Sequence, residues 1–171
     1  KINLEIKDFS IKNNNELFAK LETLNARDNT GFEITNFSCD TISVNPTSVE
    51  LKSYTIEMGN TIVKDKLRFN FLDFSAFKNF ADEVIINAEF KDTKIYLDDL
   101  VHFVKSLSNV PFIKTNGKEI IDLNGRYFGK INNLAGRNVD IKLGEKLSIA
   151  GSFNTRSLLD PDNTVLNIRL D

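Results

Sequence analysis

Apolar and polar residues alternate with a period of two along most of this chain, and no other feature of the sequence constrains its fold as strongly. In residues 2–7, for example, each aliphatic residue is followed by an asparagine or a charged residue. The same alternation recurs in residues 32–35, 41–44, 49–56, 67–71 and 84–90. Because successive side chains of a strand point to opposite faces, each segment is predicted to be a strand with one apolar and one solvated face. The pattern slips out of phase between Ile6 and Phe9 and again at Asn36, which predicts bulges or bends there.

The last third of the chain has the most regular alternation. Strands are predicted over residues 121–131, 139–143, 147–153 and 166–170. Asn132-Asn133 is predicted to be a turn because Asn tolerates positive φ. Gly144-Glu145-Lys146 is predicted to be a hairpin loop, and residues 158–163 a loop containing Pro161. Evenly spaced strands joined by short turns indicate an up-and-down antiparallel sheet.

Two stretches depart from this pattern. Phenylalanines at helical spacing predict a short helix or turn over residues 73–82. Residues 98–107 carry a wide apolar stripe that begins after two aspartates, which predicts a second short helix that cannot continue through Pro111. The span 14–24 fits either a strand or a helix, and we favour a strand. No flexible linker interrupts the chain, so residues 1–171 are predicted to form a single β-rich domain.

The composition argues against several functions. Lys and Arg number 22 and Asp and Glu 24, so the formal charge is 22 − 24 = −2, unlike the basic surface of a dedicated nucleic-acid binder. The single Cys and single His exclude an internal disulfide and a multi-histidine metal site, and Cys39 is expected to be buried. No apolar run is long enough to cross a membrane as a helix. The chain starts at Lys1 without a signal peptide, so we expect a processed product or a piece of a longer protein.

No group of residues forms a recognisable catalytic or metal-binding motif. His102 follows Asp98 by one turn of the predicted helix, but neither a nucleophile nor a third ligand accompanies them. Asp160 and Asp162 resemble the start of a calcium loop that lacks its later Gly and bidentate Glu. We therefore predict no enzyme activity and no cofactor.

The chain contains 14 Phe and no Trp, and 41% of its residues are hydrophobic. Two arrangements accommodate these residues. In a closed sandwich, two sheets bury them in a common core without any ligand. In an open sheet, one apolar face stays partly exposed and binds acyl chains, since large exposed apolar patches mark binding surfaces.

The order of the segments is more specific than any single motif. The relevant stretches are residues 21–38, residues 51–62 with Gly59-Asn60-Thr61-Ile62, residues 93–107 with Tyr96-Leu97-Asp98-Asp99-Leu100, and residues 122–153. This succession resembles the repeating β modules of the TamB translocation-and-assembly proteins, which belong with the AsmA-like proteins, in the version found in Bacteroidetes. The resemblance covers most of the chain and rests on turns, alternation and one short helix.

The resemblance implies a mainly β fold, an elongated and curved antiparallel sheet shaped like a taco shell, with the apolar face lining a groove. It implies a periplasmic part of an inner-membrane-anchored envelope protein that meets an Omp85-type outer-membrane partner. Its partners would be phospholipids or other acyl chains, and its role phospholipid transport or outer-membrane protein assembly. The groove residues carried over are Ile121, Leu123, Tyr127, Ile131, Val139, Ile141, Leu143, Leu147, Ile149 and Phe153.

Two other functions remain open. The chain could be a structural module whose sheet edges bind protein partners by strand addition. It could also be a secreted β-sandwich that binds or hydrolyses glycans, although no pair of carboxylates marks a cleft.

Overall fold

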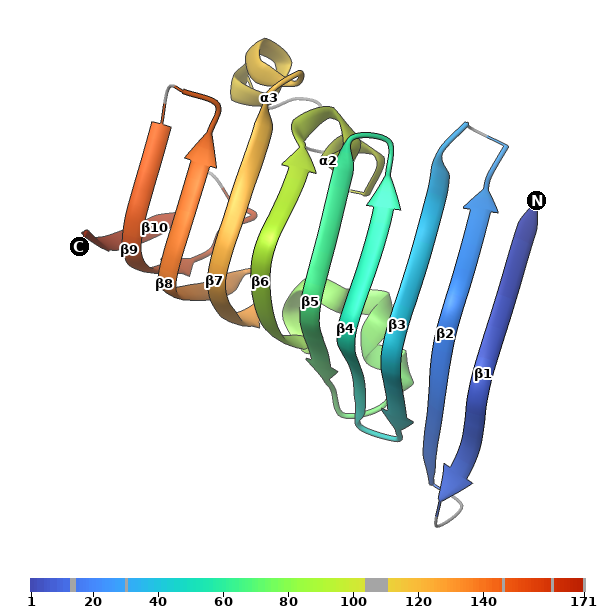
Figure 1. Cartoon of the computed structure of the whole chain (residues 1–171). Coiled ribbons are helices and arrows are strands. Elements are labelled where there is room, and N and C mark those ends of the chain that lie inside the picture. Colours follow the sequence, from blue (N-terminus) through green and yellow to red (C-terminus); the bar gives the residue numbers. More distant parts are fainter. Residues whose placement is uncertain (13–14, 30, 104–110, 146, 161, 171) are drawn as a thin grey trace.

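The computed structural model describes residues 1–171 except 13–14, 30, 104–110, 146, 161 and 171, and it omits the side chains of 100, 102, 103 and 111–113 (Figure 1). Ten strands form one antiparallel sheet in which each strand pairs with the next along the chain. The strands are β1 (Ile2–Lys12), β2 (Glu16–Arg27), β3 (Glu33–Asn45), β4 (Ser48–Met58), β5 (Thr61–Asn70), β6 (Ile85–Tyr96), β7 (Ile120–Lys130), β8 (Asn133–Leu143), β9 (Leu147–Arg156) and β10 (Val165–Leu170). The sheet is not closed, because β1 and β10 are its two edges. The predicted antiparallel meander is confirmed.

All ten described strands belong to this one sheet, so no second described sheet packs on it. The closed sandwich that the composition left open is therefore wrong for the described strands. The ambiguous span 14–24 lies mostly in β2, as we favoured. Strand β8 is longer than predicted, because it begins at Asn133 rather than near Val139.

Both predicted slips in the alternation are confirmed as shifts in strand pairing. The pairing of β1 with β2 shifts between Lys7 and Ser10. At Asn36, the pairing of β2 with β3 shifts between Leu24, which lies opposite Phe37, and Ala26.

Further bulges cross the middle of the sheet at one level. The backbone φ is positive at Asp8 (52°), Ser53 (51°), Asp65 (103°), Asp92 (52°) and Asn138 (49°), each at or beside a shift in register. Tyr54 lies opposite Asp65, and Asp65 lies opposite Phe90. Because a bulge bends its strand and increases the twist, bulges at one level bend the whole sheet along a line across the strands. Figure 1 shows the resulting curved single layer.

Short helical segments lie in two connections. Between β5 and β6, η1 (Phe74–Asn79) and α1 (Phe80–Glu83) confirm the predicted helix or turn over 73–82. The Asp73 carboxylate begins η1 by accepting a hydrogen bond from the Ser75 backbone N–H at 2.7 Å. Between β6 and β7, α2 (Leu97–Phe103) confirms the start of the predicted helix over 98–107, whose last four residues lie outside the described part.

A further helix, α3 (Pro111–Asn116), was not predicted. Its first residue is Pro111, which the sequence pattern predicts only as the residue that ends the preceding helix. Proline is also favoured in the first turn of a helix, where its missing N–H has no intrahelical partner to lose.

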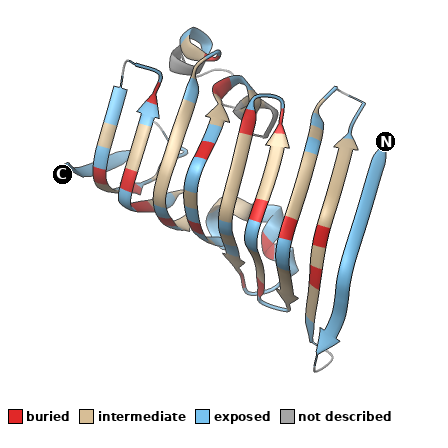
Figure 2. Ribbon diagram, in the orientation of Figure 1, coloured by how far each residue is buried: buried red, intermediate tan, exposed pale blue. Residues whose placement is uncertain are grey.

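The buried side chains gather in four clusters on one side of the sheet. The two central clusters surround Tyr54 and Tyr127. The other two form where helical segments pack on the sheet, with Val84 beneath η1 and α1, and Leu97 of α2 against Leu143. Figure 2 shows the buried positions on the inner strands, whereas β1 and β10 are exposed along their whole length. The core is thus one face of a single sheet, covered in two places by short helical segments, η1 with α1 in one and α2 in the other.

Candidate apolar binding face

Strand pairing places the alternating apolar residues on one side of the sheet, which we call the apolar face. Directly opposed residues of neighbouring strands share a face. One row across the sheet runs through Leu17, Val44, Val49, Phe69 and Ile86, and another runs through Ala19, Ile42, Leu51, Leu67, Ala88 and Tyr127. The apolar face is therefore continuous across strands that are far apart in sequence.

Nine of the ten predicted groove residues lie on this face. They come together in three rows, Ile121 with Leu143 and Leu147, Leu123 with Ile141 and Ile149, and Tyr127 with Phe153, and Val139 lies between the last two rows. The tenth, Ile131, does not join them. Strand β7 ends at Lys130, which pairs with Asn133, so Ile131 lies in the two-residue turn between β7 and β8.

Four of these residues, Val139, Ile141, Ile149 and Phe153, line a pocket of about 200 Å³ at the C-terminal end of the apolar face. Leu166 and Ile168 of β10 complete it, together with Ser152. Leu166 is 55% exposed, so the pocket wall on the β10 side is open to solvent. We call this the C-terminal pocket.

Glycines shape the C-terminal pocket. A Cβ at Gly136 would collide with the Phe153 ring, and one at Gly151 would collide with the backbone oxygen of Arg169. Glycine at these two positions therefore lets the Phe153 ring lie against β8 and lets β10 approach β9 closely. The alternation could not reveal these positions, because glycine carries no hydrophobic signal.

The N-terminal end of the apolar face is also open. Ile2, Leu4, Ile6 and Ile11 on β1 are exposed, Ile2 by 73%. A second pocket, of about 470 Å³, lies between Ile11, Leu17, Val44 and Phe74. None of these residues was predicted as a site, although residues 2–6 showed the alternation. The pairing of β1 with β2 was needed to place them on the same face.

The opposite side of the sheet, which we call the polar face, carries rows of charged side chains. Glu50 contacts both Lys52 and Lys66 at 3.4 Å. Lys94 contacts Asp122 at 3.5 Å. The three lysines are about half exposed, although the Glu50 side chain is only 13% exposed. Exposed ion pairs contribute about 0–1 kcal/mol each, so the main effect of these charges is to keep this face hydrated.

Tyr127 on the apolar face makes the stability of the fold depend on pH, because its hydroxyl is buried. Its hydroxyl donates a hydrogen bond to the Asn124 backbone oxygen at 3.2 Å. Burial raises the pKa of Tyr127 to about 12, and the Asp140 carboxylate adds to the shift. The neutral Tyr127 hydroxyl therefore stabilises the fold at pH values below the pKa of an unfolded tyrosine, about 10. This contribution is lost as the pH rises through the folded-state pKa of about 12.

We expect urea unfolding to show this loss. Between about pH 8 and about pH 11.5, titration of Tyr127 should lower the free energy of unfolding of the wild type by about 2 kcal/mol. The Tyr127→Phe variant should lack this component, so its stability should fall less over the same range. Parallel curves for the two proteins would contradict the assignment.

The other motifs considered in the sequence form no comparable site. Asp98 lies on α2, while the His102 side chain is outside the described residues. Asp160 accepts a hydrogen bond from the Asn163 side chain at 2.8 Å, as in an ordinary turn. Within the described residues, no three His, Cys, Asp or Glu side chains converge on a metal-sized space. None of the described helices has the length and apolarity to cross a membrane.

Fold and site together define an open, single-layer antiparallel β-meander with one apolar and one charged face. Comparison of the chain with protein-family models, with curated proteins and with solved structures gives no match. The function is therefore inferred from the apolar and polar faces themselves.

Proposed function

We propose that this chain is a hydrophobic β-groove module that shields the acyl chains of phospholipids on its apolar face. The observation that carries the proposal is the continuity of that face across a one-layer sheet, with an open apolar pocket at its C-terminal end. Apolar patches of more than a few hundred Å² on a protein surface are typical of binding sites.

The energetics favour an acyl chain as the ligand. Each methylene removed from water contributes about 0.8 kcal/mol, so about five methylenes in the C-terminal pocket would contribute about 4 kcal/mol. Ser152 is the one polar residue among those that line this pocket. The pocket therefore suits a chain of methylenes better than a hydrogen-bonding ligand.

The wider setting is part of the same proposal. We propose that the module belongs to a TamB-like protein of the periplasm, which acts in phospholipid transport or protein assembly at the outer membrane. In that setting the full-length protein, rather than this module, would contact an Omp85-type partner. The segment order quoted above and the open, curved meander support this setting.

Mass spectrometry of lipids that copurify with the protein tests the proposal. We expect phospholipid in extracts of the wild type and about a tenfold loss in Ile149→Asp, which places a carboxylate in the C-terminal pocket and costs binding more than about 1.4 kcal/mol. The matched control is Ser148→Asp, which adds the same carboxylate one residue away on the opposite face.

Both variants are first compared with the wild type by circular dichroism and thermal unfolding, and Leu123→Asp provides a second variant on the apolar face. A wild-type protein free of lipid would overturn the proposal. Equal lipid content in Ile149→Asp and Ser148→Asp would do the same.

A second candidate function is a scaffolding module, and the exposure of both edge strands favours it. β1 and β10 each pair on one side only within the described sheet, and all of their residues are exposed. Such edges accept a further strand from a partner. A protein partner that stays bound to Ile149→Asp, while lipid is lost, would favour this function.

A further inference from the structure

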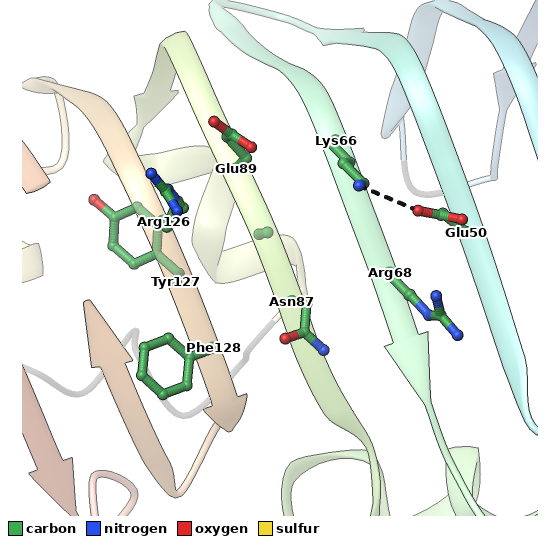
Figure 3. Close-up of a pocket in the computed structure, with 9 residues that line it drawn as sticks. Glu50, Lys66, Arg68, Asn87, Glu89, Arg126, Tyr127 and Phe128 are labelled. Atoms are coloured by element: carbon green, nitrogen blue, oxygen red, sulfur yellow. Dashed lines mark ion pairs between the residues drawn. The ribbon is translucent and has the colours of Figure 1, made fainter. Parts of the chain in front are cut away.

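A third pocket lies on the polar face, on the side of the sheet away from the C-terminal pocket. It has a volume of about 260 Å³ and spans β4 to β7. Figure 3 shows its side chains, with Lys66 and Arg68 on β5, Glu89 on β6, and Arg126 and Phe128 on β7. We call it the polar-face pocket.

The polar-face pocket is positively charged, although the whole chain is not. Its wall includes Lys66, Arg68 and Arg126, and the carboxylates of Glu50 and Glu89. Lys52 lies opposite Lys66, and Arg137 lies opposite Arg126. The charged residues that line the pocket sum to 3 − 2 = +1, and Lys52 and Arg137 add two cations just outside it, on a chain whose formal charge is −2. A local positive field of this kind favours an anionic ligand.

Two pairs of like charges face each other across neighbouring strands, and only one pair is neutralised. Like charges at directly opposed positions destabilise a sheet. Lys52 and Lys66 share the Glu50 carboxylate, which lies 3.4 Å from each. For Arg126 and Arg137, no carboxylate of a described residue lies within ion-pair distance, although Glu89 is opposite Arg126 on the other side.

Hydrogen bonds to β9 hold the Arg137 side chain. Its guanidinium donates hydrogen bonds to the Phe153 backbone oxygen at 3.0 Å and to the Asn154 side-chain oxygen at 3.1 Å. It also stacks over the Phe128 ring at 5.3 Å, and this ring is 41% exposed. Arg137 is thus occupied by contacts to β9 and to Phe128, and no carboxylate of a described residue within ion-pair distance competes with an external anion for Arg126.

We propose that the polar-face pocket binds a phosphate-bearing molecule, with Arg68 and Arg126 as its principal ligands and Lys66 in support. Guanidinium groups donate paired hydrogen bonds to phosphate oxygens. Arg68 lies in the row of Asn87 and Phe128, two residues along from the row of Arg126, so the two arginines are about 12 Å apart at the backbone. The Arg68 Nε–H donates a hydrogen bond to the Asn70 side-chain oxygen at 3.0 Å, so the terminal NH2 groups of Arg68 would contact the phosphate. A diphosphate offers oxygens to both, whereas a single carboxylate reaches one. The site is on the opposite face from the apolar site and is independent of the proposed function.

Isothermal titration calorimetry of the whole chain with sodium pyrophosphate at low ionic strength tests the site. We expect saturable binding that weakens at least about tenfold in the double variant Arg68→Gln/Arg126→Gln. The matched control, Lys94→Gln/Lys142→Gln, removes the same charge from the polar face outside the pocket and should change the affinity less than about twofold.

Glu89→Gln gives an independent test, since it removes a carboxylate that faces the bound anion and should tighten binding. Weaker binding in this variant would overturn the proposal, and so would an equal loss of affinity in the double variant and its control. All variants replace exposed side chains, and circular dichroism checks their fold.

The phosphate could come from a soluble molecule or from a lipid headgroup. Sedimentation with vesicles of phosphatidylglycerol distinguishes the two sources. Binding to pyrophosphate alone assigns a soluble ligand, and binding to vesicles that the double variant abolishes assigns a headgroup. Absence of binding to both probes would overturn the site.

Discussion

Gly125→Ala is expected to lower the free energy of unfolding by about 3–4 kcal/mol. Gly125 has a φ of +112°, which an L side chain rarely adopts. A Cβ there would lie 2.6 Å from the Asn138 backbone oxygen and 2.7 Å from the Val139 Cα. Because both atoms belong to the backbone of β8, the contact can be relieved only by moving the strands apart at the line of bulges.

Urea unfolding followed by circular dichroism measures this effect, and Gly31→Ala provides its control. Gly31 also has a positive φ, +93°, but nothing lies within 4 Å of its added Cβ. The control should therefore show the conformational cost alone, about 1 kcal/mol. Equal losses in the two variants would mean that the close approach of β7 and β8 at Gly125 contributes nothing.

Leu97→Ala is expected to lower the free energy of unfolding by about 3 kcal/mol. The Leu97 side chain is 1% exposed and packs against Leu143, with Val101 and Ile121 beside it. Truncation leaves a cavity between α2 and the sheet, so the cost includes both the lost burial and the cavity. It should also loosen α2 and expose more of this end of the apolar face.

Denaturant unfolding again gives the stability, and hydrogen exchange at the amides of α2 reports its docking. The matched control is Leu72→Ala, because Leu72 is 87% exposed and its truncation should change stability by less than about 0.5 kcal/mol. If the two leucine variants were equally stable, α2 would not be anchored on the sheet by Leu97.

The candidate site could be predicted in part, since nine of its ten predicted residues share the apolar face. Ile131 lies outside the three rows because alternation continues through a turn as readily as through a strand, and only the pairing of Lys130 with Asn133 shows where β7 ends. The C-terminal pocket also includes Leu166 and Ile168 of β10. Their alternation is visible in the sequence, but their pairing with β9 is not.

The early start of β8 was missed for a related reason. Its inward position at Gly136 is glycine because the Phe153 ring of β9 occupies the space that a side chain would fill. The contact between Gly136 and the Phe153 ring thus explains why this position of β8 carries no apolar side chain, and alternation alone does not reveal the strand there. The polar-face pocket was missed as well, since its charged residues come from four strands, β4 to β7, that only strand pairing brings together.

Alternation alone predicts that most segments are strands with one apolar and one polar side, because it acts locally on each strand. The slips in the alternation also predict two of the bulges. Whether the apolar sides are closed under a second sheet or left open is set by how the strands pair in the folded chain. That outcome depends on pairing: each strand pairs with its neighbour in sequence, so all ten form one layer, and the short helical segments cover only part of it.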